Sequence, residues 1–371
     1  MENPKYWSNV TLKIRDESIF TSPRIMAVRK FYFRSDTTDN ELVNHFFRFV
    51  TETEGYEVKY LSCYDMDLST CLVDMPSFVC KVVEIKLEQT ELSTRQFDEL
   101  FTAINQSSSL LKLKKLVVEE CYIGNTNSEY LGAAVAKLEE VSFITVDLEQ
   151  THVEAIFSAI NQSPLNLLKL RKFSLYVAQL YGVPPNTLRD AVCKIEKVGF
   201  TVCEFTKDQL DTMLAGIANC GKLKLKTLVL YDCDLEKVSY DVLATAATKL
   251  EELELTLSEL TTQHLDHLCT EIAECESLSL KTMNLYSVES LININIDVLT
   301  RAILKLEVVD LDNYLSHDQI NYVFKAIYKS SNVKLKNLFI DFRRNEVNQE
   351  LLMEAEKKVN IHTDCGKLRF I

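Results

Sequence analysis

Residues 225–254 read LKTLVLYDCDLEKVSYDVLATAATKLEELE and contain one full copy of a pattern that recurs along the chain. The stretch opens with the spacing Leu225-x-x-Leu228-x-Leu230, passes through Cys233 and a polar turn, and reopens at Leu250. Alternating apolar residues predict a short strand, and apolar residues three and four apart predict an amphipathic helix. The stretch therefore predicts one strand–helix repeat and the start of the next.

The same opening recurs from one end of the chain to the other. From Leu113 onward, its starts lie alternately 25–26 and 29–32 residues apart, so short and long repeats alternate. A period of this length is typical of a solenoid, in which each repeat packs only on its neighbours. We place the starts at Val28, Gly55, Val82, Leu113, Leu138, Leu170, Ile195, Leu225, Leu250, Leu280, Leu306 and Leu335, with Cys365-x-x-Leu368-x-Phe370 closing the series.

Strand–helix repeats of this period predict an α/β leucine-rich repeat solenoid of about twelve repeats. Parallel strands stack about 4.8 Å apart, whereas helices are about 10 Å wide, so we expect a horseshoe with the sheet on its concave face and helices outside. Residues 1–24 do not fit the period, and we expect them to form an N-terminal cap. The repeats then occupy residues 25–371, with a C-terminal cap from about 349 that includes a last helix over 349–360 and a last strand at 368–370.

The alternating repeat lengths, the helix in every repeat and a cysteine at the ninth position of several repeats resemble the ribonuclease-inhibitor type of leucine-rich repeat. We count Cys63, Cys121, Cys203 and Cys233 at that position. The resemblance covers about residues 25–371 and implies a binding scaffold, because this type also occurs in immune receptors, GTPase-activating proteins and ubiquitin-ligase adaptors. The chain has fewer Cys and Trp residues than ribonuclease inhibitor and irregular first repeats, so inhibition of ribonucleases is not carried over.

The composition of the chain indicates which class of partner and which cellular compartment to expect. The 41 basic and 54 acidic residues give a net charge of -13, which argues against nucleic acid or anionic membrane as a partner and favours a basic protein. The 11 cysteines lack the spacing of a disulfide scaffold, so we expect buried free thiols in a reducing compartment. The N-terminus resembles no signal peptide and no run of 18 apolar residues occurs, so we expect a cytoplasmic protein. We also expect the protein to be a monomer.

Two columns of residues should point away from the helices. The second residues of nine successive repeats alternate in charge, which predicts a structural ladder of paired charges. The seventh residues include Tyr176, Tyr231 and Tyr286 at intervals of 55, so their rings should recur on every second strand, about 10 Å apart. The ladder comprises Lys114, Glu139, Arg171, Glu196, Lys226, Glu251, Lys281, Glu307 and Lys336.

The tyrosines have two interpretations. Exposed aromatic residues flanked by carboxylates resemble the anchors of a protein interface. Alternatively, tyrosine fills this position in every second repeat and contacts only its neighbours. On the first interpretation, the concave partner-binding residues are Tyr176, Tyr231, Asp232, Asn284, Tyr286, Asp310, Asp312, Tyr314, Phe339 and Asp341.

Catalytic motifs are missing from the sequence. Only 8 glycines are present, and none forms a phosphate-binding loop or a nucleophile elbow. The nearest approach to a metal site is His264-x-x-His267 with Cys269 and Glu271, which we interpret as a solvated helix face. We therefore expect no catalytic, cofactor-binding or metal-binding residues and no cofactor.

The sequence favours a non-enzymatic scaffold or recognition module that binds a protein through its concave face. Two alternatives stay open. The chain regulates an enzyme, as an inhibitor or a GTPase activator, or it is the sensing part of a larger immune receptor.

Overall fold

The computed structural model describes residues 11–13, 23–35, 38, 40–71, 73–107, 110–311, 315–343 and 346–363. These residues form an α/β leucine-rich repeat solenoid, as the period predicts. The chain divides into two compact units, Met1–Ala178 and Gln179–Ile371, which are described separately. The division falls within the series of repeats, and it requires no linker because each repeat of a solenoid contacts only its neighbours.

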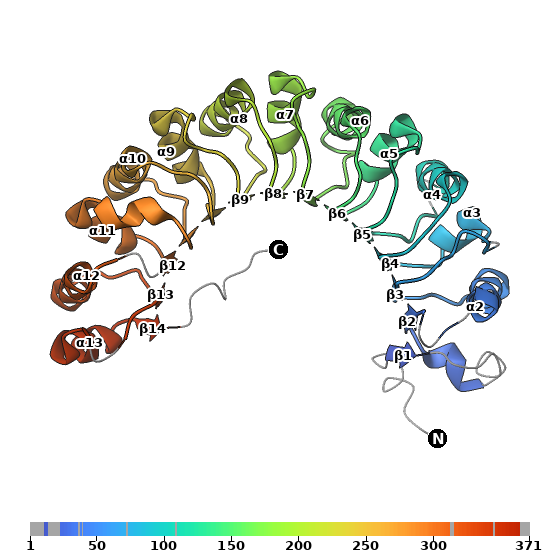
Figure 1. Cartoon of the computed structure of the whole chain (residues 1–371), viewed down its shortest axis with the longest axis horizontal. Helices are drawn as coiled ribbons and strands as arrows, with labels where there is room; N and C mark the ends of the chain where they lie inside the picture. Colours follow the sequence, from blue (N-terminus) through green and yellow to red (C-terminus); the bar gives the residue numbers. More distant parts are fainter. Residues whose placement is uncertain are drawn as a thin grey trace. The chain divides into compact units, whose positions relative to one another are not determined.

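The first unit contains one parallel sheet whose strands follow the order of the chain. Helices cover one face of the sheet, and we name the opposite face the open face (Figure 1). The elements are β1 (Thr11–Lys13), the 3-10 helix η2 (Pro23–Ala27), β2 (Lys30–Arg34), α2 (Asn40–Glu52), β3 (Tyr60–Tyr64), α3 (Met75–Val79), β4 (Glu84–Glu88), α4 (Thr94–Gln106), β5 (Lys115–Glu119), α5 (Ser128–Val135), β6 (Glu140–Ile144), α6 (Gln150–Gln162) and β7 (Lys172–Tyr176).

The second unit repeats this arrangement, again with a parallel sheet in chain order (Figure 1). Its elements are α7 (Pro185–Val192), β8 (Lys197–Thr201), α8 (Lys207–Asn219), β9 (Thr227–Tyr231), α9 (Tyr240–Lys249), β10 (Glu252–Glu254), α10 (Thr262–Glu274), β11 (Thr282–Leu285), the 3-10 helix η3 (Glu289–Asn293), α11 (Ile296–Ile303), β12 (Val308–Leu311), α12 (His317–Lys329), β13 (Asn337–Ile340), α13 (Gln349–Glu356) and β14 (Asn360–His362).

The hydrophobic pattern places the core between sheet and helices. Leu225, Leu228 and Leu230, at positions one, four and six of their repeat, are buried, as are Leu243 and Ala247 on the helix that follows. Burial of such side chains stabilises the fold by about 2 kcal/mol each. The remaining strand positions project from the open face, since successive side chains of a strand alternate.

Position eight of nine repeats has a left-handed backbone although none of these residues is glycine. Their φ angles lie between 49° and 57°. The conformation costs about 1 kcal/mol per residue, but it lets the position-eight N–H continue the ladder to the next strand. The Asp232 N–H, for example, donates to the Thr256 carbonyl at 2.8 Å, and the Leu257 N–H donates to the Tyr286 carbonyl at 3.0 Å.

Helix length explains the alternating period. The long repeats carry 13-residue helices, namely α4, α6, α8, α10 and α12. The short repeats between them carry helices of 8 to 10 residues, namely α5, α7, α9 and α11. The difference of about one helical turn matches the alternation in the sequence.

The third residue of each long helix ties its repeat to the preceding one. Gln209 of α8 is buried, and its Nε2 donates to the carbonyls of Leu180 and Val183 at 2.5 and 2.7 Å. Its Oε1 accepts from the Thr206 N–H at 2.8 Å, which completes a capping box. Gln96 of α4 contacts two carbonyls in the same way.

Histidine takes the place of this glutamine in α6 and α10. His264 Nε2 lies 2.8 Å from the Val238 carbonyl, and its Nδ1 accepts from the Thr261 N–H at 3.3 Å. His152 makes the equivalent contacts with Thr126 and Glu149. The prediction that His264 lies on a solvated helix face is therefore wrong, because this side chain is only 4% exposed and bridges two repeats.

The second repeat starts at Val58 rather than at the predicted Gly55. Val58 pairs with Val82, the first residue of the next repeat. The spacing L-x-x-L-x-L overlaps with itself when it is shifted by three residues, so both registers fit the sequence. Gly55 instead lies in the turn after α2, where its φ of 67° favours glycine. Cys63 consequently occupies position six, not position nine.

The predicted N-terminal cap falls largely outside the described residues, whereas the predicted C-terminal cap is described as far as residue 363. Of the N-terminal cap, β1 pairs in parallel with β2. At the other end, the last helix stops at Glu356, four residues before the predicted end, and β14 follows it. The strand predicted at 368–370 lies outside the described residues. Among the described helices, none has the length and apolar character that crossing a membrane requires.

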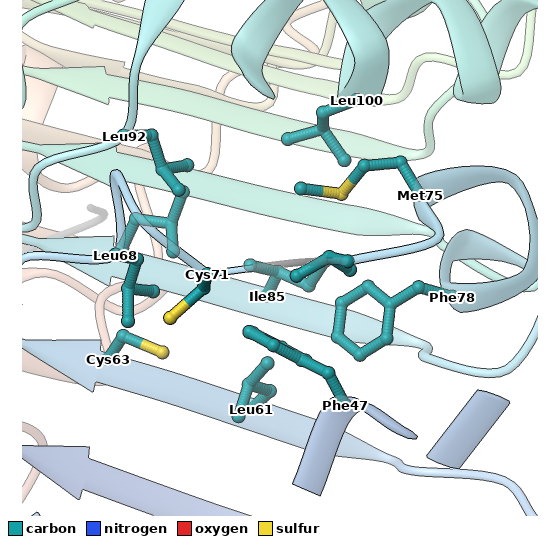
Figure 2. A pocket seen from close by; sticks show the side chains of 12 residues that line it. Phe47, Leu61, Cys63, Leu68, Cys71, Met75, Phe78, Ile85, Leu92 and Leu100 are labelled. Atoms are coloured by element: carbon teal, nitrogen blue, oxygen red, sulfur yellow. The ribbon is translucent and has the colours of Figure 1, made fainter. Parts of the chain in front are cut away.

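A small cavity of about 30 Å³ lies in the core of the first unit, beside β3 and β4 (Figure 2). Its lining is apolar apart from the thiols of Cys63 and Cys71. Cys63 is fully buried, and burial raises the pKa of its thiol to about 12. Position six is occupied elsewhere by larger residues, such as Leu87 and Val118 on the next two strands. The cavity therefore results from a short side chain at a position that normally fills the core.

We expect Cys63→Val to raise the free energy of unfolding by about 1 kcal/mol, because one added methyl group fills apolar space. Urea unfolding followed by circular dichroism measures the change. The control is Cys121→Val, because the Cys121 thiol contacts the Glu119 carbonyl at 3.2 Å and valine loses that contact. A Cys63→Val protein that unfolds at lower urea concentration than the parent would contradict the interpretation of the cavity.

Candidate partner-binding surface

The open face of the second unit brings two of the three predicted tyrosines together. Tyr231 ends β9, and Tyr286 follows β11 directly. β10 pairs with both of these strands, so Tyr231 and Tyr286 occupy equivalent positions two strands apart. Adjacent strands are about 4.8 Å apart, which places the two residues about 10 Å apart. The strand register therefore places this pair on every second strand, as the interval of 55 residues predicts.

Thr256 lies between the two tyrosines on the same edge. It is 3% exposed, whereas both tyrosines are half-buried. Within the described part of the chain, the hydroxyl groups of Tyr231 and Tyr286 make no hydrogen bond. A tyrosine with part of its ring and its hydroxyl available to solvent is typical of a binding surface.

A row of buried polar side chains runs across the middle of this face. Glu254 of β10, Asn284 of β11 and Asp310 of β12 are paired in register and are 2%, 2% and 0% exposed. Glu254 Oε1 accepts from the Thr256 hydroxyl at 3.2 Å, and Asn284 Oδ1 accepts from the Tyr286 N–H at 2.9 Å. Asn284 and Asp310 therefore belong to the framework of the surface rather than to its exposed part.

Sequence reasoning missed Glu254. It stands between Leu253 and Leu255, at position five, which projects from the open face. The sequence did contain a signal for this residue. Position five holds a polar residue between two core residues in three successive repeats, namely Glu254, Asn284 and Asp310.

Acidic residues continue from the tyrosines onto the edge where the strands end. Asp232 is exposed and follows Tyr231 directly. Beyond it, the carboxylates of Asp234, Glu236 and Glu259 lie within 4.8 Å of one another, and all three residues are exposed. Lys237 partly offsets them through an ion pair with Asp234 at 3.5 Å. This edge therefore carries excess negative charge next to an aromatic residue.

The remaining predicted residues are spread more widely. Phe339 on β13 is half-buried, and its ring stacks on His362 with centroids 4.5 Å apart. Asp341 follows β13 and is exposed. Tyr176 ends β7 in the first unit, whereas Tyr231 and Tyr286 belong to the second unit. Asp312 and Tyr314 lie outside the described residues.

Ion pairs confirm the charge ladder at position two for seven of its nine residues, all except Arg171 and Glu196. Lys114 and Glu139 form an ion pair at 2.9 Å in the first unit. In the second unit, Glu251 lies 3.9 Å from Lys226 and 2.7 Å from Lys281, whose hydrogen bond lowers the pKa of Glu251. Glu307 pairs with Lys336 at 2.6 Å. These charges have partners within the sheet, so they are poor candidates for contacts with another molecule.

The first unit has a second ladder that sequence reasoning missed. At position three, Lys115 lies 3.0 Å from Glu84 and 3.8 Å from Glu140, and Lys172 lies 2.8 Å from Glu140. At position five, Lys86 pairs with Glu88 and Glu119 at 2.6 and 2.8 Å.

The pairing at position five changes the protonation equilibrium of Lys86. Burial acts against its charged form, but the hydrogen bonds and charges of Glu119 and Glu88 outweigh this effect and raise the pKa of Lys86. The open face of this unit is therefore extensively neutralised by its own charges.

No protein-family model and no curated protein matches the chain. Among solved structures, the chain is similar to one described as the crystal structure of the TLR13–ssRNA13 complex, with 13% sequence identity and a TM-score of 0.45 over 97% of this chain. The chain spans 52% of that structure's chain. The assignment of the fold as a leucine-rich repeat solenoid rests on the strand–helix repeats themselves.

Proposed function

We propose that this chain is a non-enzymatic recognition module that binds a protein through the open face of its second unit. The observation that carries the proposal is the pair of half-buried tyrosines, Tyr231 and Tyr286, whose hydroxyl groups make no hydrogen bond within the described residues. Aromatic residues of this kind supply a large share of the affinity at protein interfaces. The polar row beside them is buried, and Tyr286 is tied to it because its N–H donates to Asn284 Oδ1.

Charge supports a basic protein partner. The exposed Asp232, Asp234, Glu236 and Glu259 stand beside or beyond Tyr231, and the whole chain has a net charge of -13. Lysine or arginine side chains on a partner would complement this edge, whereas the phosphates of a nucleic acid would be repelled. We further propose that the chain is a cytoplasmic monomer and that its repeats are of the ribonuclease-inhibitor type. Its alternating repeat lengths and its free thiols support this proposal.

We expect the double substitution Tyr231→Ala, Tyr286→Ala to weaken partner binding at least tenfold, because interface tyrosines commonly contribute about 2 kcal/mol each. Affinity capture with the intact chain, followed by quantitative mass spectrometry, compares the recovered proteins. The matched control is Tyr130→Ala, Tyr328→Ala, which removes two tyrosines from helices α5 and α12 that are 42% and 45% exposed.

The two double variants must first show the same circular dichroism spectrum and thermal unfolding as the parent. Proteins that are lost with the first variant and kept by the control are the partners, and salt should weaken their binding. Equal recovery of every captured protein by both variants would rule out the proposed surface.

A further inference from the structure

Four half-buried cysteines occupy one recurring place in the fold. Cys80, Cys193, Cys220 and Cys275 each cap the C-terminus of a helix, namely α3, α7, α8 and α10. The other described cysteines are buried. Only α7 and α8 belong to successive repeats, so only Cys193 and Cys220 can meet at this edge of the solenoid.

Contacts confirm that these two residues lie together. The side chains of Cys193 and Cys220 interact at the C-terminal ends of the neighbouring helices α7 and α8. The backbone is also close, since the Cys193 carbonyl accepts from the Lys224 N–H at 3.2 Å. A β-carbon built on Gly221, next to Cys220, would meet no atom within 4 Å, so the turn after α8 has room to adjust. A sulfur–sulfur bond of about 2.05 Å requires the two sulfur atoms to approach each other, and the free space at this turn permits that movement.

We propose that Cys193 and Cys220 form an oxidation site in which a low-molecular-weight disulfide, such as oxidised glutathione, converts the two thiols into an intramolecular disulfide. The bond joins the C-terminal ends of α7 and α8 on the helical side of the second unit. It is independent of the binding surface proposed above, which lies on the open face.

The chemistry proceeds by two exchanges. Burial, together with the nearby Cys220 and Asp190, raises the pKa of the Cys193 thiol to about 12, so the first exchange falls to Cys220. The Cys220 thiolate attacks one sulfur of oxidised glutathione, and the departing glutathione thiolate takes up the proton that Cys220 has lost. Cys193 then attacks the Cys220 sulfur of the mixed disulfide, and its proton passes to the second departing glutathione. The two cysteines lose two electrons, and one oxidised glutathione becomes two reduced molecules.

The full-length protein provides a direct test. The reduced chain is treated with oxidised glutathione, the remaining thiols are blocked with N-ethylmaleimide, and a tryptic digest is analysed without reduction. Cys193 and Cys220 fall in the separate tryptic peptides 190–194 and 208–222, each with one cysteine. We expect the linked pair to exceed the mixed disulfide of either peptide at least tenfold and to disappear after treatment with dithiothreitol.

Variants and controls complete the test. In Cys193→Ser, Cys220 should stop at the mixed disulfide, and in Cys220→Ser the linked pair should be lost. Cys80 and Cys275 are matched controls, because each caps a helix in the same way but no cysteine caps the helix of an adjacent repeat. Recovery of Cys193 and Cys220 in unlinked peptides, whether blocked or glutathionylated, overturns the proposal. An equal yield of the linked pair in urea would also overturn it, since the folded contact would then play no part.

Discussion

Replacing Gln209 with alanine is expected to lower the free energy of unfolding by about 3 kcal/mol, a large effect for a single polar side chain. The amide of Gln209 donates to the Leu180 and Val183 carbonyls and accepts from the Thr206 N–H. Alanine makes none of these bonds and leaves polar groups buried at the junction of two repeats. Urea unfolding monitored by circular dichroism gives the change in stability.

Histidine at the same position is the informative control. His152 and His264 perform the same task in α6 and α10, with one ring nitrogen facing a carbonyl and the other accepting from the N-cap N–H. Gln209→His should therefore recover at least half of the stability that Gln209→Ala loses. If both variants are equally unstable, the side chain acts through packing rather than through its hydrogen bonds.

Gly132→Ala is expected to destabilise the first unit by about 2 kcal/mol, because α5 and α6 approach each other too closely for a methyl group. A β-carbon at Gly132 would lie 2.5 Å from the Ala155 carbonyl oxygen and 2.7 Å from its carbon. Both atoms belong to the backbone of α6, so the helices must separate, and the higher helix propensity of alanine offsets this only in part. Thermal unfolding by differential scanning calorimetry measures the loss.

Alanine substitutions at two other glycines serve as comparisons for Gly132→Ala. Gly221→Ala should change the stability by less than about 0.5 kcal/mol, since nothing lies within 4 Å of the added carbon. At Gly216 the added carbon would overlap Cγ and Cδ of Arg189, so that side chain must change its rotamer and an intermediate loss is expected. A Gly132→Ala protein as stable as Gly221→Ala would show that the two helices adjust freely.

The repeating pattern of the sequence was sufficient to predict the fold. A strand that packs on a helix buries the residues at positions one, four and six of its repeat, here Leu225, Leu228 and Leu230. The spacing of these apolar residues therefore predicts the fold directly. The prediction failed at the second repeat because the pattern overlaps with itself when it is shifted by three residues. Pairing of Val58 with Val82 decides that register, and pairing between strands is a tertiary property.

The candidate site could be predicted only in outline. Counting residues placed Tyr231 and Tyr286 on one face, because their separation of 55 equals two repeats. Counting did not show that Asn284 and Asp310 are buried while Asp232 is exposed. Exposure depends on what the adjacent strands place beside a residue, and the paired residues of β9, β10, β11 and β12 are more than 20 residues apart in the chain.

By itself the sequence determined the class of fold, the alternation of long and short repeats and the paired charges along the strands, because each follows from contacts between equivalent positions of successive repeats. Only the tertiary structure decided that His264 bridges two repeats, that Cys193 meets Cys220 and that a cavity lies beside Cys63. These features arise where a single repeat departs from the common pattern. Their consequences depend on the particular side chains that the fold brings next to them, which the spacing of residues does not reveal.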